Sequence, residues 1–328
     1  MKNIAILSAF VIMLFLFSAI TPAFSQHNQQ FARSYGFSVG AQTGFVYGQA
    51  GEYVYPTNTL ADLLSELLWD MKPVFYWGIA LDFGLIDFME KPGFFASLSF
   101  KSGIAGDSGK MEDRDWKSIL NTDLTNYSEH INRTREFFWL DAAAGASIPV
   151  RHYFYIKPFL SFSWMRFAFT ARDGFYQYAT EVIKGIYLPI EDAPKTPVQG
   201  EVVKYEQDWI ILAPGFKIGM DFLSFISVDL SFQISPFAFC IARDDHLITQ
   251  TVFLDYTGWG LFLEPRVNLT FKWDSFSISL EAAYRFISKT TGYTHMRESP
   301  WHSYVLSANA SGASLSIFDA RLIARLRF

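Results

Sequence analysis

The sequence contains one cysteine, Cys240, among 328 residues, so no intramolecular disulfide can form. Only 18% of the residues are charged, and 32 acidic side chains outnumber 27 basic ones. We therefore expect no basic patch and no nucleic-acid partner. Half of the residues are hydrophobic, which excludes a disordered chain. Cys240 has no histidine at motif spacing and is interpreted as a packing residue.

Long apolar runs are also scarce. The single run of nearly membrane-spanning length, Ile4–Ile20, is at the N-terminus, which excludes a helical protein with several membrane spans. Lys2 precedes this run, and the small-residue site Ala23-Phe24-Ser25 follows it, as in a cleavable secretory signal. We expect residues 1–25 to be this signal and residues 26–328 to form one domain. An uncleaved membrane anchor is the alternative.

Aromatic residues are abundant, at 18%, although the mean hydropathy is only +0.14. In segment 276–286 apolar residues occupy every second position, and Ser, Glu and Arg fill most positions between them. Segment 226–235 alternates in the same way. This period of two predicts β-strands with one apolar and one polar face.

The whole chain contains an even number of such segments. Ten strands are predicted, at 35–48, 75–87, 93–106, 135–148, 153–170, 205–222, 226–243, 258–273, 276–290 and 314–328. Short connections alternate with long ones, and the last strand ends with an aromatic residue, Phe328. These features predict an all-β fold, a ten-stranded antiparallel transmembrane β-barrel with short periplasmic turns and long extracellular loops. The aromatic residues are then expected in the lipid-facing band.

Two polar pairs are predicted at the long-loop end. Asp113 and Asp115 lie in the second long loop, and Asp244 and His246 end the seventh strand. Residues i and i+2 of an extended chain share a face, so each pair projects to one side. An aspartate beside a histidine raises its basicity, and two neighbouring carboxylates favour a shared proton. Together they could activate a water molecule; a cation site and a solvated rim are the alternatives.

For Asp244 and His246 to face the inside of the barrel, the register of the seventh strand must shift. Its even-numbered residues face lipid up to Ile234, whereas Asp244 and His246 must face inward. We predict a one-residue slip near Ser235-Pro236, because proline is tolerated at bulges and a bulge exchanges the faces.

These residues resemble the omptins, ten-stranded outer-membrane endoproteases of Gram-negative bacteria. The similarity spans the mature chain and is strongest at 111–116 (Met-Glu-Asp-Arg-Asp-Trp), 169–174 (Phe-Thr-Ala-Arg-Asp-Gly) and 244–246 (Asp-Asp-His). The resemblance implies an aspartic-type endopeptidase that cleaves peptide or protein substrates at the surface of the bacterial outer membrane. It assigns the catalytic roles to a set of four residues, Asp113, Asp115, Asp244 and His246. His246 would be the general base, Asp244 would orient it, and the aspartate couple would hold the water or polarise the carbonyl.

The resemblance also implies substrate and lipid sites. Omptins prefer a basic residue before the scissile bond and read it with two acidic side chains; Glu52 matches one, but Ala242 stands at the second position. Met111 matches a residue lining this pocket. Arg166 matches a basic group that binds lipopolysaccharide, a required activator, whereas Asp208 replaces another such group.

Two other functions stay open at this stage. A catalytically weak relative could serve as a surface adhesin or binding protein, which Ala242 favours. A passive pore is disfavoured because side chains fill a ten-stranded barrel. No cofactor or metal is implied, since the spacing of His295 and His302 fits no metal motif.

Overall fold

The computed structural model describes residues 35–56, 62–85, 92–151, 154–223 and 225–328. The predicted export signal at 1–25 lies outside the described residues, as do parts of three predicted turns, 86–91, 152–153 and 224. Among the described residues there is no helix long and apolar enough to cross a membrane. The strands are β1 (Tyr35–Val54), β2 (Ser65–Leu85), β3 (Gly93–Gly103), β4 (Gly106–Asp115), β5 (Asn126–Arg151), β6 (Phe154–Tyr178), β7 (Glu181–Ile183), β8 (Ile186–Tyr187), β9 (Thr196–Leu223), β10 (Ile226–His246), β11 (Thr251–Lys272), β12 (Phe276–Ile287), β13 (Thr291–Arg297) and β14 (Val305–Arg327), with a short 3-10 helix at Ile190–Asp192.

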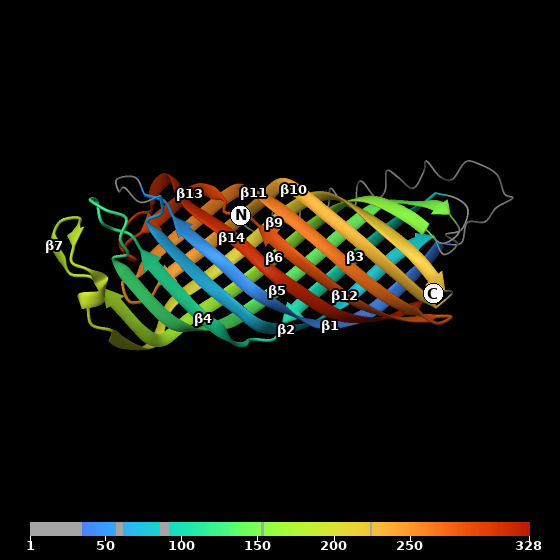
Figure 1. The fold of residues 1–328 in the computed structure, drawn as a ribbon, viewed down its shortest axis with the longest axis horizontal. Coiled ribbons are helices and arrows are strands. Elements are labelled where there is room, and N and C mark those ends of the chain that lie inside the picture. Colours follow the sequence, from blue (N-terminus) through green and yellow to red (C-terminus); the bar gives the residue numbers. More distant parts are fainter. Residues whose placement is uncertain (1–34, 57–61, 86–91, 152–153, 224) are drawn as a thin grey trace. The chain divides into compact units, whose positions relative to one another are not determined.

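Antiparallel pairing closes the strands into a ring. The order is β1, β14, β12, β11, β10, β9, β6, β5, β3 and β2, and β2 pairs back with β1. Further along the barrel, β4 takes the place of β3 between β2 and β5, and β13 takes the place of β12 between β11 and β14. The ring thus has ten positions, which confirms the predicted barrel. Among the described residues, closure pairs the two edges of the large sheet with each other, and Figure 1 shows the strands at a steep tilt.

The strands run further at one end than the sequence pattern predicts. The first strand continues to Val54, and the fourth predicted strand already begins at Asn126. Parts of the predicted loops at 48–74, 106–134 and 171–204 are therefore strand. The pattern fades there because charged residues such as Glu66 and Arg114 replace apolar ones on the outer face. We call this end, with the connections 116–125, 179–195 and 247–250, the loop end; the β7–β8 hairpin belongs to it (Figure 1).

Two irregularities exchange the faces of strands. In β10 the register shifts between Ser235 and Ala238, so Ile234 and Phe237 are both exposed while Ala238 is buried. This confirms the predicted slip. In β2 an extra residue opposite Val46 and Gly48 has the same effect, and Trp69 points inward whereas Trp77 points outward. Pro73 lies within this second bulge, which was not predicted from the sequence.

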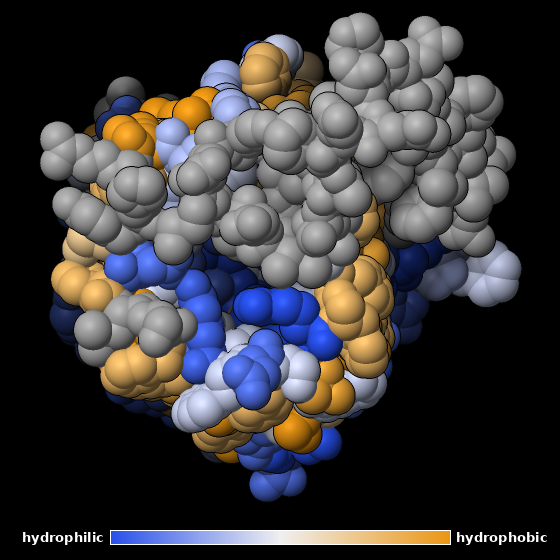
Figure 2. Space-filling view, turned by 90° about the vertical axis from the view of Figure 1, so that its right-hand side faces the viewer, coloured by the Kyte–Doolittle hydropathy of each residue, from blue (hydrophilic) through white to orange (hydrophobic). Residues whose placement is uncertain are grey.

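The outer face carries an apolar belt toward the end with the C-terminus. Exposed members include Ile79, Tyr284, Phe318 and Leu322, which confirms the lipid-facing assignment for β12 and β14. Seen from that end, hydrophilic residues gather in the middle and hydrophobic ones along the rim (Figure 2).

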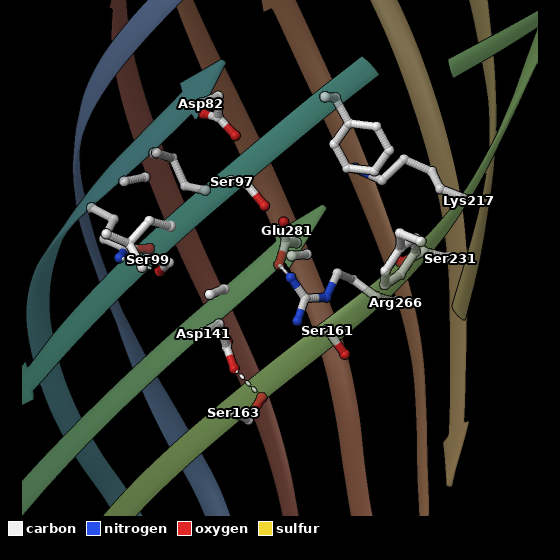
Figure 3. A pocket seen from close by; sticks show the side chains of 18 of the residues that line it. Asp82, Ser97, Ser99, Asp141, Ser161, Ser163, Lys217, Ser231, Arg266 and Glu281 are labelled. Atoms are coloured by element: carbon white, nitrogen blue, oxygen red, sulfur yellow. Dashed lines mark hydrogen bonds and ion pairs between the residues drawn. The ribbon is translucent and has the colours of Figure 1, made fainter. Parts of the chain in front are cut away.

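The lumen inside this belt is polar. Arg266 Nη1 lies 2.9 Å from Glu281 Oε1, both beside a cavity of about 110 Å³ (Figure 3). Lys101 Nζ lies 2.7 Å from Asp319 Oδ2, with both side chains buried. Opposite charges thus compensate one another where water is largely excluded.

A layer of buried aromatic side chains fills the lumen toward the loop end. Trp69 stacks on Tyr205 and Phe169, with ring centroids 5.3 and 5.7 Å apart. Further members are Phe137, Trp139, Phe167 and Trp209. Many aromatic residues therefore pack inside the barrel and not in the lipid-facing band where the sequence analysis placed them. A lumen packed in this way does not suit a passive pore.

Candidate active site

The two predicted polar pairs lie on opposite walls of the ring. Asp113 and Asp115 are on β4, and Asp244 and His246 are on β10. The bulge in β10 turns Asp244 inward, and Asp244 and Asp115 are both buried. The charge of His246 lowers the pKa of Asp113, and the charges of both β4 aspartates raise the pKa of His246. The fold therefore brings all four side chains into one electrostatic site.

This site lies beyond the apolar belt. On β1 the exposed apolar side chains are Phe37, Val39 and Tyr47, and the inward-facing Glu52 follows them toward the loop end. On β10 the exposed Phe237 and Phe239 precede Asp244 in the same direction. The site is thus outside the membrane-spanning part of the barrel.

Asp244 and His246 form a close pair. Asp244 Oδ2 lies 2.6 Å from His246 Nε2, and the Asp244 side chain is buried whereas His246 is partly open. Burial lowers the pKa of His246, but the charge and hydrogen bond of Asp244 outweigh it and raise the pKa to about 9. Asp244 also shares a side-chain hydrogen bond with Glu52. Asp244 can therefore orient the imidazole of His246 and stabilise its protonated form.

The two aspartates of the couple have different neighbours. Asp115 Oδ2 lies 2.7 Å from Lys117 Nζ, whereas Asp113 Oδ1 accepts a hydrogen bond from the Ser65 hydroxyl, at 3.4 Å. Burial, and then the charge of Asp115, raise the pKa of Asp113 to about 8. Asp113 is therefore suited to donate a hydrogen bond at neutral pH. Lys117 was not identified from the sequence, although its i+2 spacing from Asp115 places it on the same face.

Glu52 and Met111 belong to the wall of the aspartate couple. Glu52 is opposite Leu67, which is opposite Asp113, so Glu52 and Asp113 share a row of the sheet with one strand between them. Glu52 is 2% exposed, and its pKa is raised by burial and then by the charges of Asp244 and Asp255. Met111 is buried one row below Asp113, opposite Trp69. Both predicted pocket residues thus adjoin the catalytic candidates.

Asp255 is a further acidic residue that the sequence analysis missed. It stands opposite Ala242 in the β10–β11 pair and is 4% exposed. Burial raises its pKa to about 7, with a contribution from the charge of Asp244. The predicted strand began at 258, so Asp255 fell in a presumed loop. The only available signal was an aspartate within the β-prone segment 251–257.

Arg166 is on the outer wall, apart from this site. Its guanidinium lies 3.0 Å from Glu136 Oε2, 2.8 Å from Glu206 Oε2 and 2.8 Å from Asp208 Oδ2. These ion pairs connect β5, β6 and β9. The acidic neighbours make this part of the wall unfavourable for a phosphate.

The sequence also singles out segment 169–174 and the histidines His295 and His302. In segment 169–174, Asp173 and Gly174 have φ angles of 53° and 102°, at a register shift between β6 and β9. His295 is on β13, and His302 Nδ1 lies 3.1 Å from Ser299 Oγ in the next connection. Within the described ranges, no group of three or more His, Cys, Asp or Glu side chains is arranged to hold a metal ion.

Comparison with known proteins gives three concordant matches. The model of the omptin family matches residues 33–322. The plasminogen activator of Yersinia pestis is 25% identical over 246 residues, which cover 71% of this chain and 70% of that protein. The crystal structure of the outer membrane protease OmpT from Escherichia coli matches with a TM-score of 0.78 and 17% identity, covering 92% of this chain and 100% of OmpT. Since the family match spans most of the sequence, this chain belongs to the omptin family and is an outer-membrane endopeptidase.

Proposed function

We propose that the protein hydrolyses peptide bonds with a water molecule activated between the Asp244–His246 dyad and the Asp113–Asp115 couple. The observation that carries this proposal is the placement of both pairs on facing walls of one partly open site. A general base and its nucleophile must approach within hydrogen-bonding distance, and a water between the two walls meets this requirement.

Each side chain has a defined task in this mechanism. The neutral imidazole of His246 takes a proton from the water, whose oxygen attacks the carbonyl carbon of the scissile bond. Asp113, held protonated by its surroundings, donates a hydrogen bond to the carbonyl oxygen as negative charge develops there. His246 then gives its proton to the leaving nitrogen, and the C–N bond breaks. Asp244 orients the imidazole and balances its charge during the step.

The preferred substrate has a basic residue before the scissile bond. Glu52 is a buried acidic side chain, and the buried Met111 contributes an apolar wall beside it. A Lys or Arg side chain combines an apolar stem with a cationic head, which matches this pairing.

The predicted roles of lipopolysaccharide as activator and of Arg166 as its ligand stay predictions. The three carboxylates around Arg166 favour a structural role for its guanidinium, because their charges repel a lipid phosphate.

The test of the mechanism uses refolded protein and a fluorogenic peptide with one Arg. We expect His246→Ala and Asp113→Asn to lower kcat by about 10²–10⁴-fold each, with folding checked by heat-dependent migration on gels. Glu201→Gln, which alters an exposed carboxylate on β9, serves as the matched control. Cleavage at the wild-type rate in both site variants would falsify the assignment. Binding of the peptide without cleavage by the wild-type protein would favour a surface binding protein.

A further inference from the structure

The pocket predicted for a basic side chain lacks its second carboxylate in the sequence. Ala242 faces the lumen, with 3% exposure, two residues before Asp244 on the same face of β10. Its direct cross-strand neighbour on β11 is Asp255. Directly opposed residues of antiparallel strands project to the same side, about 5 Å apart. The inward carboxylate missing at position 242 is therefore present one strand away.

Several buried polar groups surround Asp255. The hydroxyls of Thr294 and Ser311, both buried, donate hydrogen bonds to its carboxylate and lower its pKa, although burial raises that pKa more strongly. Glu52 and Asp244 are likewise buried and share a hydrogen bond. Thr294 is opposite Asp255 in the β11–β13 pair. An incoming cationic group with several N–H donors would form charge-assisted hydrogen bonds to these buried carboxylates.

Small side chains line the wall between Glu52 and Asp255. Glu52 is opposite Ala313 on β14, and Ser311 faces the lumen two residues away. Ala242 borders Asp255 on the other side. Small side chains thus separate the two acidic residues around this wall, whereas bulky ones such as Trp69 and Tyr205 fill the layer below.

We propose that Asp255 is a specificity-determining residue which, together with Glu52, binds the cationic head of the Lys or Arg side chain preceding the scissile bond. This inference rests on the proposed function and locates its substrate preference. The charge of Asp255 acts on Glu52, and both act with Asp244, so the pocket adjoins the dyad. A cation entering there would pair with both carboxylates and allow both to ionise.

The test compares two peptides that differ only in Arg or the neutral isostere citrulline at the cleavage position. The wild-type protein should prefer the Arg peptide by about 30-fold or more in kcat/KM. Asp255→Asn should remove most of this preference through KM, and change kcat/KM for the citrulline peptide by less than about threefold. Glu201→Gln should keep the wild-type ratio.

A double variant that moves the carboxylate from β11 to β10 tests the proposal without relying on Asp255→Asn alone. Asp255→Ala combined with Ala242→Asp returns a carboxylate to the neighbouring strand and should restore the Arg preference to within about tenfold of wild type. Equal cleavage of both peptides by the wild-type protein, or an unchanged ratio in folded Asp255→Asn, overturns the proposal. Failure of the catalytic mechanism is distinguishable, because it appears as full activity of His246→Ala on either peptide.

Discussion

Asp244 Oδ2 and His246 Nε2 lie 2.6 Å apart on the inner face of β10, a face that these residues reach only through the register shift after Ser235. Without the shift, both side chains would point to the outside of the barrel, because the even-numbered residues up to Ile234 do so. A local irregularity of the strand thus creates the dyad.

The pH dependence of cleavage should reflect His246 and Asp113. The mechanism requires neutral His246, with a pKa of about 9, and protonated Asp113, with a pKa of about 8. Raising the pH increases the population of neutral His246 and decreases that of protonated Asp113. We therefore expect kcat/KM to rise up to about pH 8 and to fall above about pH 9. Asp244→Asn removes the charge that raises the pKa of His246, so the maximum should move to lower pH as kcat falls. A profile of kcat/KM from pH 5 to 10 checks this, and a maximum near pH 5 in the wild type would contradict it.

Lys117 should tune the aspartate couple. Its charge lowers the pKa of Asp113, so Lys117→Met should raise that pKa and move the maximum of the pH profile to higher pH. Loss of the partner of Asp115 should also lower kcat/KM by about tenfold at pH 7. Lys117→Arg should keep both properties. Lys195→Met, at a lysine over the Phe175 ring, is the control and should leave the profile unchanged.

The aromatic layer should dominate the stability of the loop end. Trp69 is fully buried between Tyr205 and Phe169, so Trp69→Ala should lower the free energy of unfolding by about 3–5 kcal/mol. Trp77, on the outward face of the same strand, is 54% exposed. Trp77→Ala should cost less than Trp69→Ala when reversible urea unfolding is measured in the same vesicles. Equal losses would argue against the packed lumen.

Arg166 offers a test of lipid dependence. Its three ion pairs connect strands, so Arg166→Gln should lower the free energy of unfolding by about 1–3 kcal/mol. If the guanidinium is structural, the stimulation of cleavage by added lipopolysaccharide should be the same in the variant and the wild type. Selective loss of that stimulation would instead support the lipid-binding role predicted from the sequence. Titration of activity with lipopolysaccharide separates the two.

The sequence pattern predicted the barrel well where one strand face meets lipid. In segment 276–286 the alternation is unbroken, and β12 covers Phe276–Ile287. Beyond the apolar belt, both faces carry polar side chains, and the pattern no longer marks strand. For this reason the pattern predicts loop for β4, which carries Asp113 and Asp115, and for the start of β11, which carries Asp255.

The candidate site was accessible from sequence because its chemistry lies in short local pairs. The spacing of Asp113 from Asp115 and of Asp244 from His246 predicted a shared face within each pair, and Pro236 indicated the slip. Lys117 and Asp255 were not predicted, since each acts through a partner or neighbour whose position depends on strand pairing.

The sequence by itself thus determined the class of fold, the strand number and the catalytic candidates, because periodicity and i, i+2 spacing are local properties of an extended chain. Only the tertiary structure decided that β4 and β10 stand on facing walls, that the Trp69 layer fills the lumen beneath them, and that Asp255 stands opposite Ala242. These relationships depend on register and ring closure, which join residues far apart in the chain, and a one-residue change in register would exchange every face involved.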